Sequence, residues 1–245
     1  MTEEWILVLG ANSDIAVATA RRLALDGCNV HLASRNICEL EKEAAHLNVR
    51  FGVEARAVFF DALDFDSHAV FYAGLSPKPV GVIVAFGKLG DHLAAQRDFS
   101  VAKAIMDTNY CGAVSILEVV AADFERRKSG FIVGISSVAG DRGRKGNYIY
   151  GSAKAGFSAY LSGLRQRLSA SGVSVLNVKP GFVATKMTAE LGLPGKLTAS
   201  PQDVAEKIVA GIKKKKNILY VKPVWRLIMW VIIHLPEYVF KRVNL

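Results

Sequence analysis

Tyr150 and Lys154 stand four residues apart at the start of a predicted helix, so they share one face about one turn apart. A phenol with an ordinary pKa of about 10 carries protons poorly near neutral pH. A neighbouring ammonium group favours the phenolate and lowers that pKa towards the working range. Ser137 ends a predicted strand thirteen residues earlier, where its hydroxyl could hold a substrate carbonyl oxygen beside the phenol. The three residues predict proton transfer at a carbonyl, although the tyrosine and lysine alone could be an ordinary helix pair.

The amino-terminal segment has the pattern of a dinucleotide site. A short apolar strand, Trp5–Leu9, runs into a turn of small residues at 10–16 and then into a helical pattern. Such a turn brings backbone N–H groups to a pyrophosphate. A plain strand-to-helix turn capped by Ser13 or Asp14 would show the same residues, so both interpretations stay open.

The next two predicted strands end in residues suited to the adenosine half of a dinucleotide. Ser34 and Arg35 follow the second strand, where an acid would bind an unmodified ribose and a cation favours a 2′-phosphate. Asp61 follows the third strand and could accept a hydrogen bond from the adenine amino group. Arg35 could instead be a solvated residue at a helix start, and Asp61 a helix cap. The pattern favours NADP(H), with NAD(H) as the alternative.

Short apolar runs alternate with helical patterns along the chain, and these elements must position the side chains above. Runs such as 6–9 and 82–86 are almost wholly apolar, as strands buried on both faces of a parallel sheet require. The alternation predicts an α/β fold, a doubly wound, mostly parallel seven-stranded sheet (Rossmann fold) with helices on both faces. The predicted strands are 5–9, 29–33, 54–60, 81–86, 130–136, 173–179 and 218–221. The predicted helices are 15–26, 37–49, 101–128, 150–170 and 201–215.

The charge of the chain is concentrated at its carboxyl end. The net charge is +9, and residues 211–245 hold eight basic side chains against one acid, a net +7. The apolar run 227–233 lies in this segment and is far shorter than the roughly 20 residues of a spanning helix. We expect a single domain over residues 1–221 and an apolar, basic C-terminal appendage over 222–245 that makes peripheral contact with a membrane. Packing over the substrate pocket or in a dimer is the alternative.

Composition excludes several classes of protein. With 51% hydrophobic residues and no low-complexity tract, the chain is neither disordered nor a disulfide scaffold. Its three Cys have no metal-ligand spacing, so we expect no metal, and the amino end does not look like a signal peptide. We expect a cytoplasmic location, peripheral at the inner face of the membrane. We expect no nucleic-acid partner, because the basic tail lacks aromatic residues interleaved for stacking on bases.

Over nearly its whole length the chain resembles the short-chain dehydrogenase/reductase family. The resemblance rests on Gly10, Asp61, Asn109, Ser137, Tyr150, Lys154 and the segment Pro180-Gly181 with Thr185. It implies hydride transfer between a nicotinamide and a carbonyl, with Tyr150 as general acid or base and Ser137 positioning the carbonyl. Lys154 would bind the nicotinamide ribose and tune Tyr150, and Asn109 would hold a water in a proton relay. A homodimer or homotetramer is also implied.

The resemblance implies a set of cofactor-binding residues at the ends of the strands. They are Gly10, Asn12, Ser13, Asp14, Ile15, Ser34, Arg35, Asp61, Ala62, Ala85, Phe86, Gly87, Tyr150, Lys154, Pro180, Gly181, Val183 and Thr185. Two segments depart from the family pattern: Asp14 and Ala16 replace the second and third glycines of the turn, and 84–87 reads VAFG instead of NNAG. Asp14 would repel a pyrophosphate if it pointed inward, but facing outward it complements a helix amino end. Neither departure touches the catalytic residues, so we expect an enzyme rather than a dinucleotide-sensing partner protein.

Three cations, Arg142, Arg144 and Lys145, lie in the loop that borders the substrate pocket in this topology. They predict an anionic group on the substrate, unless they are simply solvated. A soluble 3-oxoacyl-thioester or small-ketone reductase is the alternative within the family. One branch, the decaprenylphosphoryl-2-keto-erythro-pentose reductases, implies a keto-sugar linked to a polyprenyl phosphate. The segments that resemble this branch are 84–91, 139–142, 180–187 and 234–236.

Overall fold

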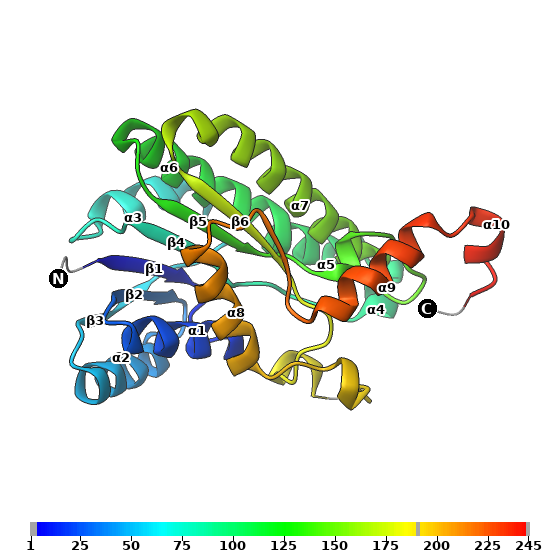
Figure 1. Ribbon diagram of the computed structural model, residues 1–245, viewed down its shortest axis with the longest axis horizontal. Coiled ribbons are helices and arrows are strands. Elements are labelled where there is room, and N and C mark those ends of the chain that lie inside the picture. Colours follow the sequence, from blue (N-terminus) through cyan, green and yellow to red (C-terminus); the bar gives the residue numbers. More distant parts are fainter. Residues whose placement is uncertain (1–3, 190–191, 244–245) are drawn as a thin grey trace.

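The computed structural model describes residues 4–189 and 192–243, so residues 1–3, 190–191 and 244–245 of the expected domain and appendage lie outside the described residues. Its strands are β1 (Trp5–Leu9), β2 (Asn29–Ser34), β3 (Ala55–Phe59), β4 (Gly81–Val84), β5 (Phe131–Ile135), β6 (Ser174–Lys179) and β7 (Ile218–Tyr220). Within the described residues these seven strands form one sheet in the order β3-β2-β1-β4-β5-β6-β7, and every neighbouring pair is parallel. The predicted doubly wound α/β fold is confirmed (Figure 1).

Helices cover both faces of the sheet (Figure 1). Because side chains alternate along a strand, Ile6 and Val8 pack into one core cluster, while Leu7 and Leu9 pack into the other. The first cluster is completed by α1 (Asp14–Leu25), α2 (Ile37–Phe51) and α8 (Pro201–Lys213). The second is completed by α3 (His68–Gly74), α6 (Gly112–Arg127) and α7 (Tyr148–Leu168). Short turns of 3-10 helix are η1 (Phe65–Ser67), η3 (Val138–Gly140), η4 (Ser169–Ser171), η5 (Lys186–Thr188) and η6 (Gly195–Leu197).

The prediction of one continuous α-helix over 101–128 is wrong, because a π-helical turn interrupts it. After α4 (His92–Arg97), the chain forms α5 (Phe99–Met106), then a π-helical turn η2 (Asp107–Cys111), and only then α6. A π turn inserts an extra residue into the helical period, so the apolar pattern continues while the backbone bulges. Such bulges frequently occur at functional sites, and this one contains the buried Asn109.

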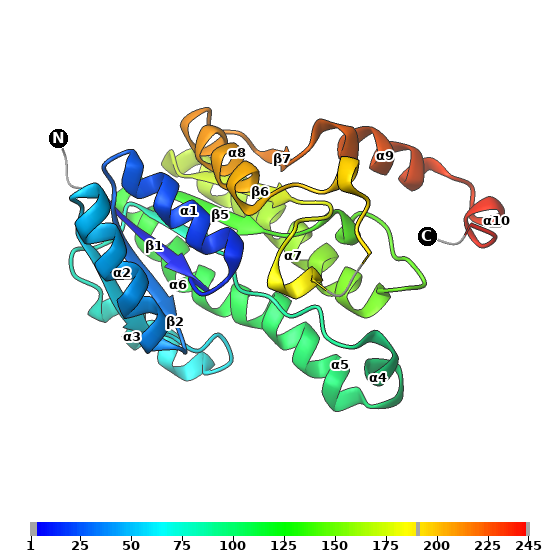
Figure 2. The same cartoon turned by 90° about the horizontal axis from the view of Figure 1, so that it is seen from below.

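The carboxyl-terminal segment folds into α9 (Pro223–His234) and α10 (Glu237–Phe240), which lie beyond the carboxyl ends of the strands in two views (Figures 1 and 2). One face of α9, formed by Trp225, Met229 and Ile232, is buried against the body of the protein. The residues that it packs against are Val138, Phe182, Leu197 and Tyr220. The opposite face is exposed and also apolar, with Leu227, Trp230, Val231 and Ile233. No helix in the described part of the chain is both long and apolar enough to cross a membrane.

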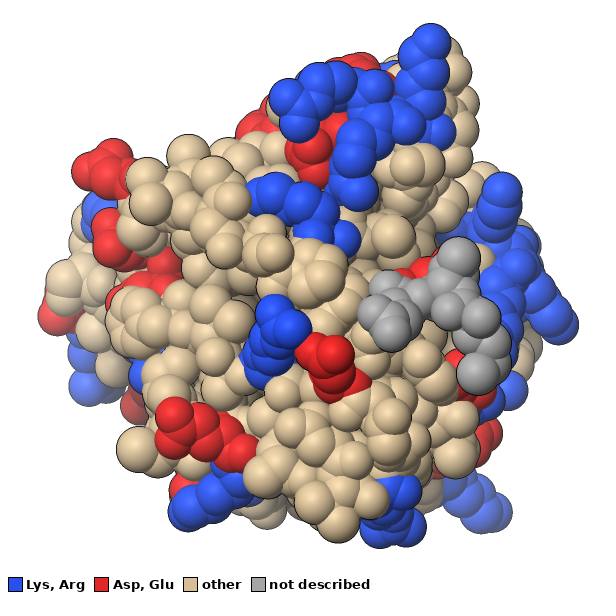
Figure 3. Space-filling view, turned by 90° about the vertical axis from the view of Figure 1, so that its left-hand side faces the viewer, with Lys and Arg blue, Asp and Glu red and all other residues tan. Residues whose placement is uncertain are grey.

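The basic side chains of the +7 segment do not form one surface. The exposed lysines 213–216 come before β7, at the edge of the sheet that holds the amino ends of the strands. Figure 3 views the molecule from this side, where Lys and Arg gather in separate groups. The apolar helix α9, in contrast, follows β7 and lies at the other edge. Only Lys222, Arg226, Lys241 and Arg242 therefore accompany the apolar run.

Candidate active site

The carboxyl ends of the central strands meet at one edge of the sheet, and a cavity of about 280 Å³ lies there. In a doubly wound sheet, ligands bind at this edge, where the strand order reverses between β1 and β4. The predicted site residues that line this cavity, called here the cofactor cavity, follow the ends of β1, β4, β5 and β6 or lie at the starts of α1 and α7. They are Asn12, Ser13, Asp14, Ile15, Ala85, Phe86, Gly87, Ser137, Tyr150, Lys154, Pro180, Gly181, Val183 and Thr185.

The predicted proton-transfer pair lies at the back of the cofactor cavity. The Lys154 Nζ lies 5.7 Å from the centroid of the Tyr150 ring and donates a 3.0 Å hydrogen bond to the Ile135 carbonyl oxygen. Burial raises the pKa of Tyr150 to about 12, and the Ser137 hydroxyl opposes this shift. Burial lowers the pKa of Lys154 to about 8. The Tyr150 pKa is therefore shifted in the direction opposite to the predicted lowering, because desolvation of the phenolate is the largest cause of the shift.

Two serines at the end of β5 connect the strand to α7. The Ser137 Oγ caps η3 by accepting a 3.1 Å hydrogen bond from the Ala139 backbone N–H, and it faces the cofactor cavity. The buried Ser136 Oγ donates to the Lys154 carbonyl oxygen at 2.9 Å and lies 2.7 Å from the Ser158 Oγ. Ser136 thus fixes the backbone of Lys154 against the sheet. The sequence did not single it out, and its place beside Ser137 was the only signal.

Asn109 lies behind the cofactor cavity, in the π turn. Its Nδ2 donates to the carbonyl oxygens of Lys88 at 2.7 Å and Ile105 at 2.8 Å, and its Oδ1 accepts from the Lys88 N–H at 3.3 Å. A Cβ added to Gly87 would come within 2.8 Å of the Asn109 Oδ1, so the two segments pack without room for a side chain. Asn109 therefore holds the 87–88 segment in place with its side chain, and its part in a water relay stays a prediction.

The turn after β1 packs closely against the segment that follows β4. Gly10 has a φ of +78°, and a Cβ there would lie 2.5 Å from the Phe86 backbone nitrogen. Ser13 caps α1 by accepting from the Ala16 N–H at 3.2 Å, which leaves the helix amino end facing the cofactor cavity. The Asn12 Oδ1 is buried and has no partner among the described residues, so an acceptor is free at this point. These features fit the phosphates and ribose of a dinucleotide.

A smaller cavity of about 120 Å³, called here the adenosine cavity, adjoins this turn. Among its lining residues are the predicted adenosine-binding residues Gly10, Ser34, Arg35, Asp61 and Ala62, together with Phe86 and Gly87 of the cofactor cavity. Thr108 also lines it, a residue that the sequence did not suggest. The Asp61 Oδ1 accepts a 3.0 Å hydrogen bond from the Leu63 N–H, so this carboxylate caps a turn while it lines the cavity. Asp61 can therefore act as a cap and still face a bound adenine, so the two interpretations raised for it are compatible.

A third cavity, about 490 Å³ in volume, shares Ser137 and Tyr150 with the cofactor cavity and is called here the substrate cavity. Most of its walls are apolar, with Leu89, Ile105, Val138, Phe182, Met187 and Trp225 among them. Arg144 is the one Lys or Arg among the described residues that line it. A reacting carbonyl between the two cavities would therefore have Tyr150 beside it and apolar walls around the rest of its molecule.

Of the three predicted substrate cations, two do not line the substrate cavity. The Arg142 guanidinium donates to the carbonyl oxygens of Ile232 at 2.5 Å and Leu235 at 2.7 Å, and it pairs with Glu237 at 2.8 Å. The prediction that Arg142 binds substrate is therefore wrong, because it satisfies the free carbonyls at the end of α9. Lys145 is exposed, and only its backbone carbonyl makes a described contact, 3.0 Å from the His92 Nε2.

Trp225 forms a wall of the substrate cavity. From the sequence alone, this residue belongs only to the expected C-terminal appendage. A Cβ added to Gly181 would lie 2.0 Å from the Trp225 ring, so the ring occupies the space that a side chain would take. The ring also packs edge-on against Phe182, with centroids 5.3 Å apart, and its Nε1 donates to the Leu197 carbonyl oxygen at 3.1 Å. The buried face of α9 therefore closes the pocket, as the alternative for the tail expected.

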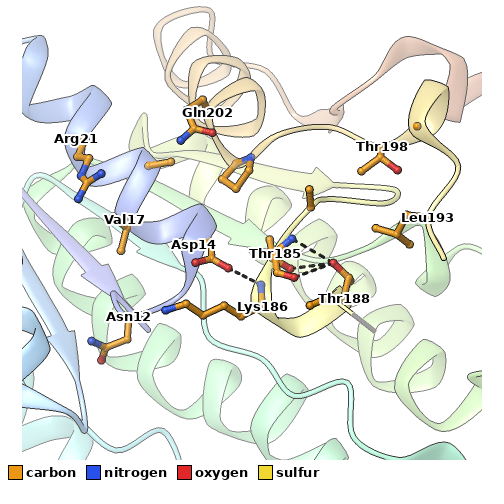
Figure 4. Close-up of a pocket in the computed structure, with 15 residues that line it drawn as sticks. Asn12, Asp14, Val17, Arg21, Thr185, Lys186, Thr188, Leu193, Thr198 and Gln202 are labelled. Atoms are coloured by element: carbon orange, nitrogen blue, oxygen red, sulfur yellow. Dashed lines mark hydrogen bonds between the residues drawn. The ribbon is translucent and has the colours of Figure 1, made fainter. Parts of the chain in front are cut away.

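An open cavity of about 850 Å³ lies beside the cofactor cavity, between α1, α8 and residues 184–189 and 193–198 (Figure 4). The Asp14 Oδ2 accepts a 2.7 Å hydrogen bond from the Lys186 backbone N–H across this space. Lys186 and Thr188 line both cavities, and neither was predicted from the sequence. The sequence offered one indication of their role, because both closely follow the predicted cofactor residue Thr185.

Residues 4–194 match the sequence profile of the family described as short chain dehydrogenase. The chain belongs to the short-chain dehydrogenase family. It is therefore an oxidoreductase acting on alcohol and carbonyl groups, and not the dinucleotide-sensing partner considered above. An uncharacterized oxidoreductase of Mycobacterium tuberculosis is 36% identical over 240 residues, which cover 97% of this chain and 96% of that relative.

Two further proteins are similar over most of the chain. An uncharacterized oxidoreductase of Streptomyces coelicolor is 38% identical over 243 residues, which cover 97% of this chain and 94% of the relative. A variant of the actinorhodin polyketide ketoreductase, solved with NADPH, has a TM-score of 0.81 at 23% identity, with 89% of this chain and 95% of that chain covered. At this identity the solved structure supports the fold of this short-chain dehydrogenase.

Proposed function

We propose that this short-chain dehydrogenase reduces a ketone to a secondary alcohol with NADPH, and that Tyr150 donates the proton. The observation that carries the proposal is the position of Ser137 and Tyr150 at the junction of the cofactor and substrate cavities. A carbonyl at this junction would reach both hydroxyl groups. Reduction by this route forms one C–H bond and one O–H bond.

NADPH, when bound, supplies the hydride that attacks the carbonyl carbon. Ser13 and the amino end of α1 would hold its pyrophosphate, and the Asn12 Oδ1 would accept from a ribose hydroxyl. Lys154 would bind the nicotinamide ribose. Arg35 lines the adenosine cavity, where a guanidinium suits a 2′-phosphate. NADPH in the solved ketoreductase of the same fold supports this choice over NADH.

The residues of the chain perform the proton half of the reaction. With a pKa raised to about 12, Tyr150 keeps its proton near neutral pH and can donate it to the carbonyl oxygen as negative charge develops there. The Ser137 hydroxyl donates a hydrogen bond to the same oxygen and holds it beside the phenol. Lys154, whose pKa is lowered to about 8, can return a proton towards the phenolate. Ser136 keeps Lys154 in register with the sheet.

The substrate is an amphiphilic ketone with an anionic group. The Arg144 Nε is buried in the cavity wall with no partner among the described residues, and the guanidinium donates only to the Val138 carbonyl oxygen, at 3.2 Å. The nearby Asp141 carboxylate is engaged by Lys179 and by the Tyr220 hydroxyl. A guanidinium among apolar walls favours a carboxylate or phosphate on the substrate. A neutral small ketone would leave Arg144 without an anionic partner.

A lipid-linked keto-sugar phosphate would match both the cation and the apolar walls, and it agrees with the branch that the sequence resembles. Membrane contact would follow from the exposed face of α9, where Leu227 and Trp230 stand beside Arg226. The acid of this segment, Glu237, is already paired with Arg142. The surface is therefore suited to an anionic lipid leaflet rather than to a neutral one.

The test is a panel of ketones, assayed by consumption of NADPH and of NADH with wild type and with Tyr150→Phe. We expect turnover of anionic, apolar ketones by wild type, and a loss of about 10²- to 10⁴-fold in kcat for the variant. NADPH binding, measured by its fluorescence, should be unchanged, because the ring and its packing remain. Undiminished turnover by the variant would refute Tyr150 as the donor. A preference for neutral ketones would refute the substrate class alone.

A further inference from the structure

The turn that should meet the cofactor pyrophosphate has an unfavourable charge. Asp14 occupies the first position of α1, where the family pattern has a glycine, and it lines the cofactor cavity. A carboxylate at a helix amino end is stable by itself, because it complements the helix dipole. Beside a bound pyrophosphate, however, the same carboxylate repels the ligand. A dinucleotide site with this turn needs a compensating cation.

The structure shows what Asp14 contacts. Its Oδ2 accepts a 2.7 Å hydrogen bond from the backbone N–H of Lys186, which begins the 3-10 turn η5. The same turn is capped at Thr185, whose N–H donates to the Thr188 Oγ1 at 3.2 Å. Asp14 thus fastens the segment after β6 to the amino end of α1. This contact fixes where the side chain of Lys186 begins.

The Lys186 side chain runs along the mouth of the cofactor cavity. In Figure 4 its amino group extends from η5 towards Asn12, on the turn that follows β1, while its backbone N–H points back to Asp14. Lys186 lines the cofactor cavity and the open cavity beside it. A single residue therefore engages the carboxylate through its backbone and presents an ammonium group to the place where a pyrophosphate would lie.

We propose that Lys186 binds the pyrophosphate of the dinucleotide, and that Asp14 is the residue that positions it. The pair takes the place of the glycine-rich turn that the chain lacks. Lys186 supplies the positive charge, and the amino end of α1 supplies backbone N–H donors. This inference rests on the proposed use of a nicotinamide dinucleotide. It assigns Lys186 to the part that NADPH and NADH share, whereas Arg35 is assigned to the 2′-phosphate.

The experiment measures dissociation constants of NADPH and NADH without substrate, by nucleotide fluorescence, for wild type, Lys186→Met and Lys186→Arg. Lys186→Met should weaken both nucleotides by about tenfold and by similar factors, since it removes one charge-assisted hydrogen bond. Lys186→Arg should restore most of the binding. Lys207→Met, on the exposed face of α8, is the matched control and should bind like wild type. Circular dichroism of each variant checks that the fold is retained.

A second variant tests whether Lys186 offsets the charge of Asp14. Asp14→Asn keeps an oxygen that can accept from the Lys186 N–H, so Lys186 stays in position, but it removes the negative charge. Lys186→Met should therefore weaken nucleotide binding less in this background than in wild type. Equal costs in both backgrounds would overturn the coupling. Binding of Lys186→Met within twofold of wild type would overturn the assignment, and so would a loss confined to NADPH, which would put the ammonium group at the 2′-phosphate. If wild type binds neither nucleotide, the proposed function fails instead.

Discussion

The cofactor cavity and the substrate cavity meet at Tyr150 but are built from different kinds of structure. The cofactor cavity is lined by the ends of the four central strands, whose parallel register brings them to one edge. The substrate cavity takes its walls from loops, from the residues after β6 and from Trp225, which lies on α9 beyond the last strand. The strand ends and the start of α7 therefore hold the reacting groups, and the peripheral segments determine which substrate fits. Substitutions on the two sides should separate these contributions.

Trp225→Ala should have the largest effect on the substrate side. The side chain is 4% exposed and fills the space above Gly181, so its removal leaves a cavity. We expect the free energy of unfolding to fall by about 3 kcal/mol, measured by urea denaturation. The KM for a ketone should rise, while the NADPH dissociation constant of the folded fraction stays the same.

A matched control lies on the same helix. Trp230 is 60% exposed, so Trp230→Ala should change the unfolding free energy by less than about 0.5 kcal/mol. Equal losses in the two variants would show that α9 is held to the protein in another way. Weaker NADPH binding in Trp225→Ala would show that the two cavities are not separable.

Arg144→Met should act on substrate recognition alone. We expect the KM of an anionic ketone to rise about tenfold or more, which corresponds to the loss of a hydrogen bond to a charged group. The KM of a neutral ketone of similar shape should fall or stay the same, because a buried charge is removed from an apolar cavity. Lys145→Met, in the same loop but exposed, is the control. An equal effect on charged and neutral ketones would contradict the anionic substrate.

The same division between the two cavities explains how much could be predicted from the sequence. Ser137, Tyr150 and Lys154 follow from local spacing, because a strand end and a helix start place them within one short segment. The strand ends around Asn12 and Thr185 were also predictable, since parallel strands bring their carboxyl ends together. These are properties of regular secondary structure, and the confirmed fold depends on the same alternation of apolar runs.

Features that depend on distant partners could not be predicted. Arg142 looked like its neighbour Arg144, but the carbonyl oxygens that engage it lie 90 residues or more along the chain. The raised pKa of Tyr150 depends on burial by surrounding elements, which its spacing to Lys154 does not report. The lysines 213–216 and the apolar run are close in sequence, yet β7 carries the chain from one edge of the sheet to the other between them.

Arg35→Asp should alter the cofactor side in a selective way. A carboxylate in the adenosine cavity repels a 2′-phosphate and can accept hydrogen bonds from an unmodified ribose. We expect the ratio of kcat/KM for NADPH over NADH to fall by about tenfold, with the ketone KM unchanged. The ratio is measured from initial rates with each nucleotide. An unchanged ratio would remove Arg35 from the 2′-phosphate site.

The smallest expected effect compares the two basic groups of the carboxyl-terminal segment. If the exposed face of α9 contacts an anionic leaflet, Arg226→Gln should reduce co-sedimentation with phosphatidylserine-containing vesicles by about fivefold, since one basic side chain near such a surface contributes about 1 kcal/mol. Lys214→Gln makes the same change of charge at the opposite edge of the sheet and should have little effect. Equal losses would mean that binding depends on net charge and not on this face. Failure of wild type to bind the vesicles, with a dimer that Trp230→Ser dissociates, would show that a second copy covers α9 instead.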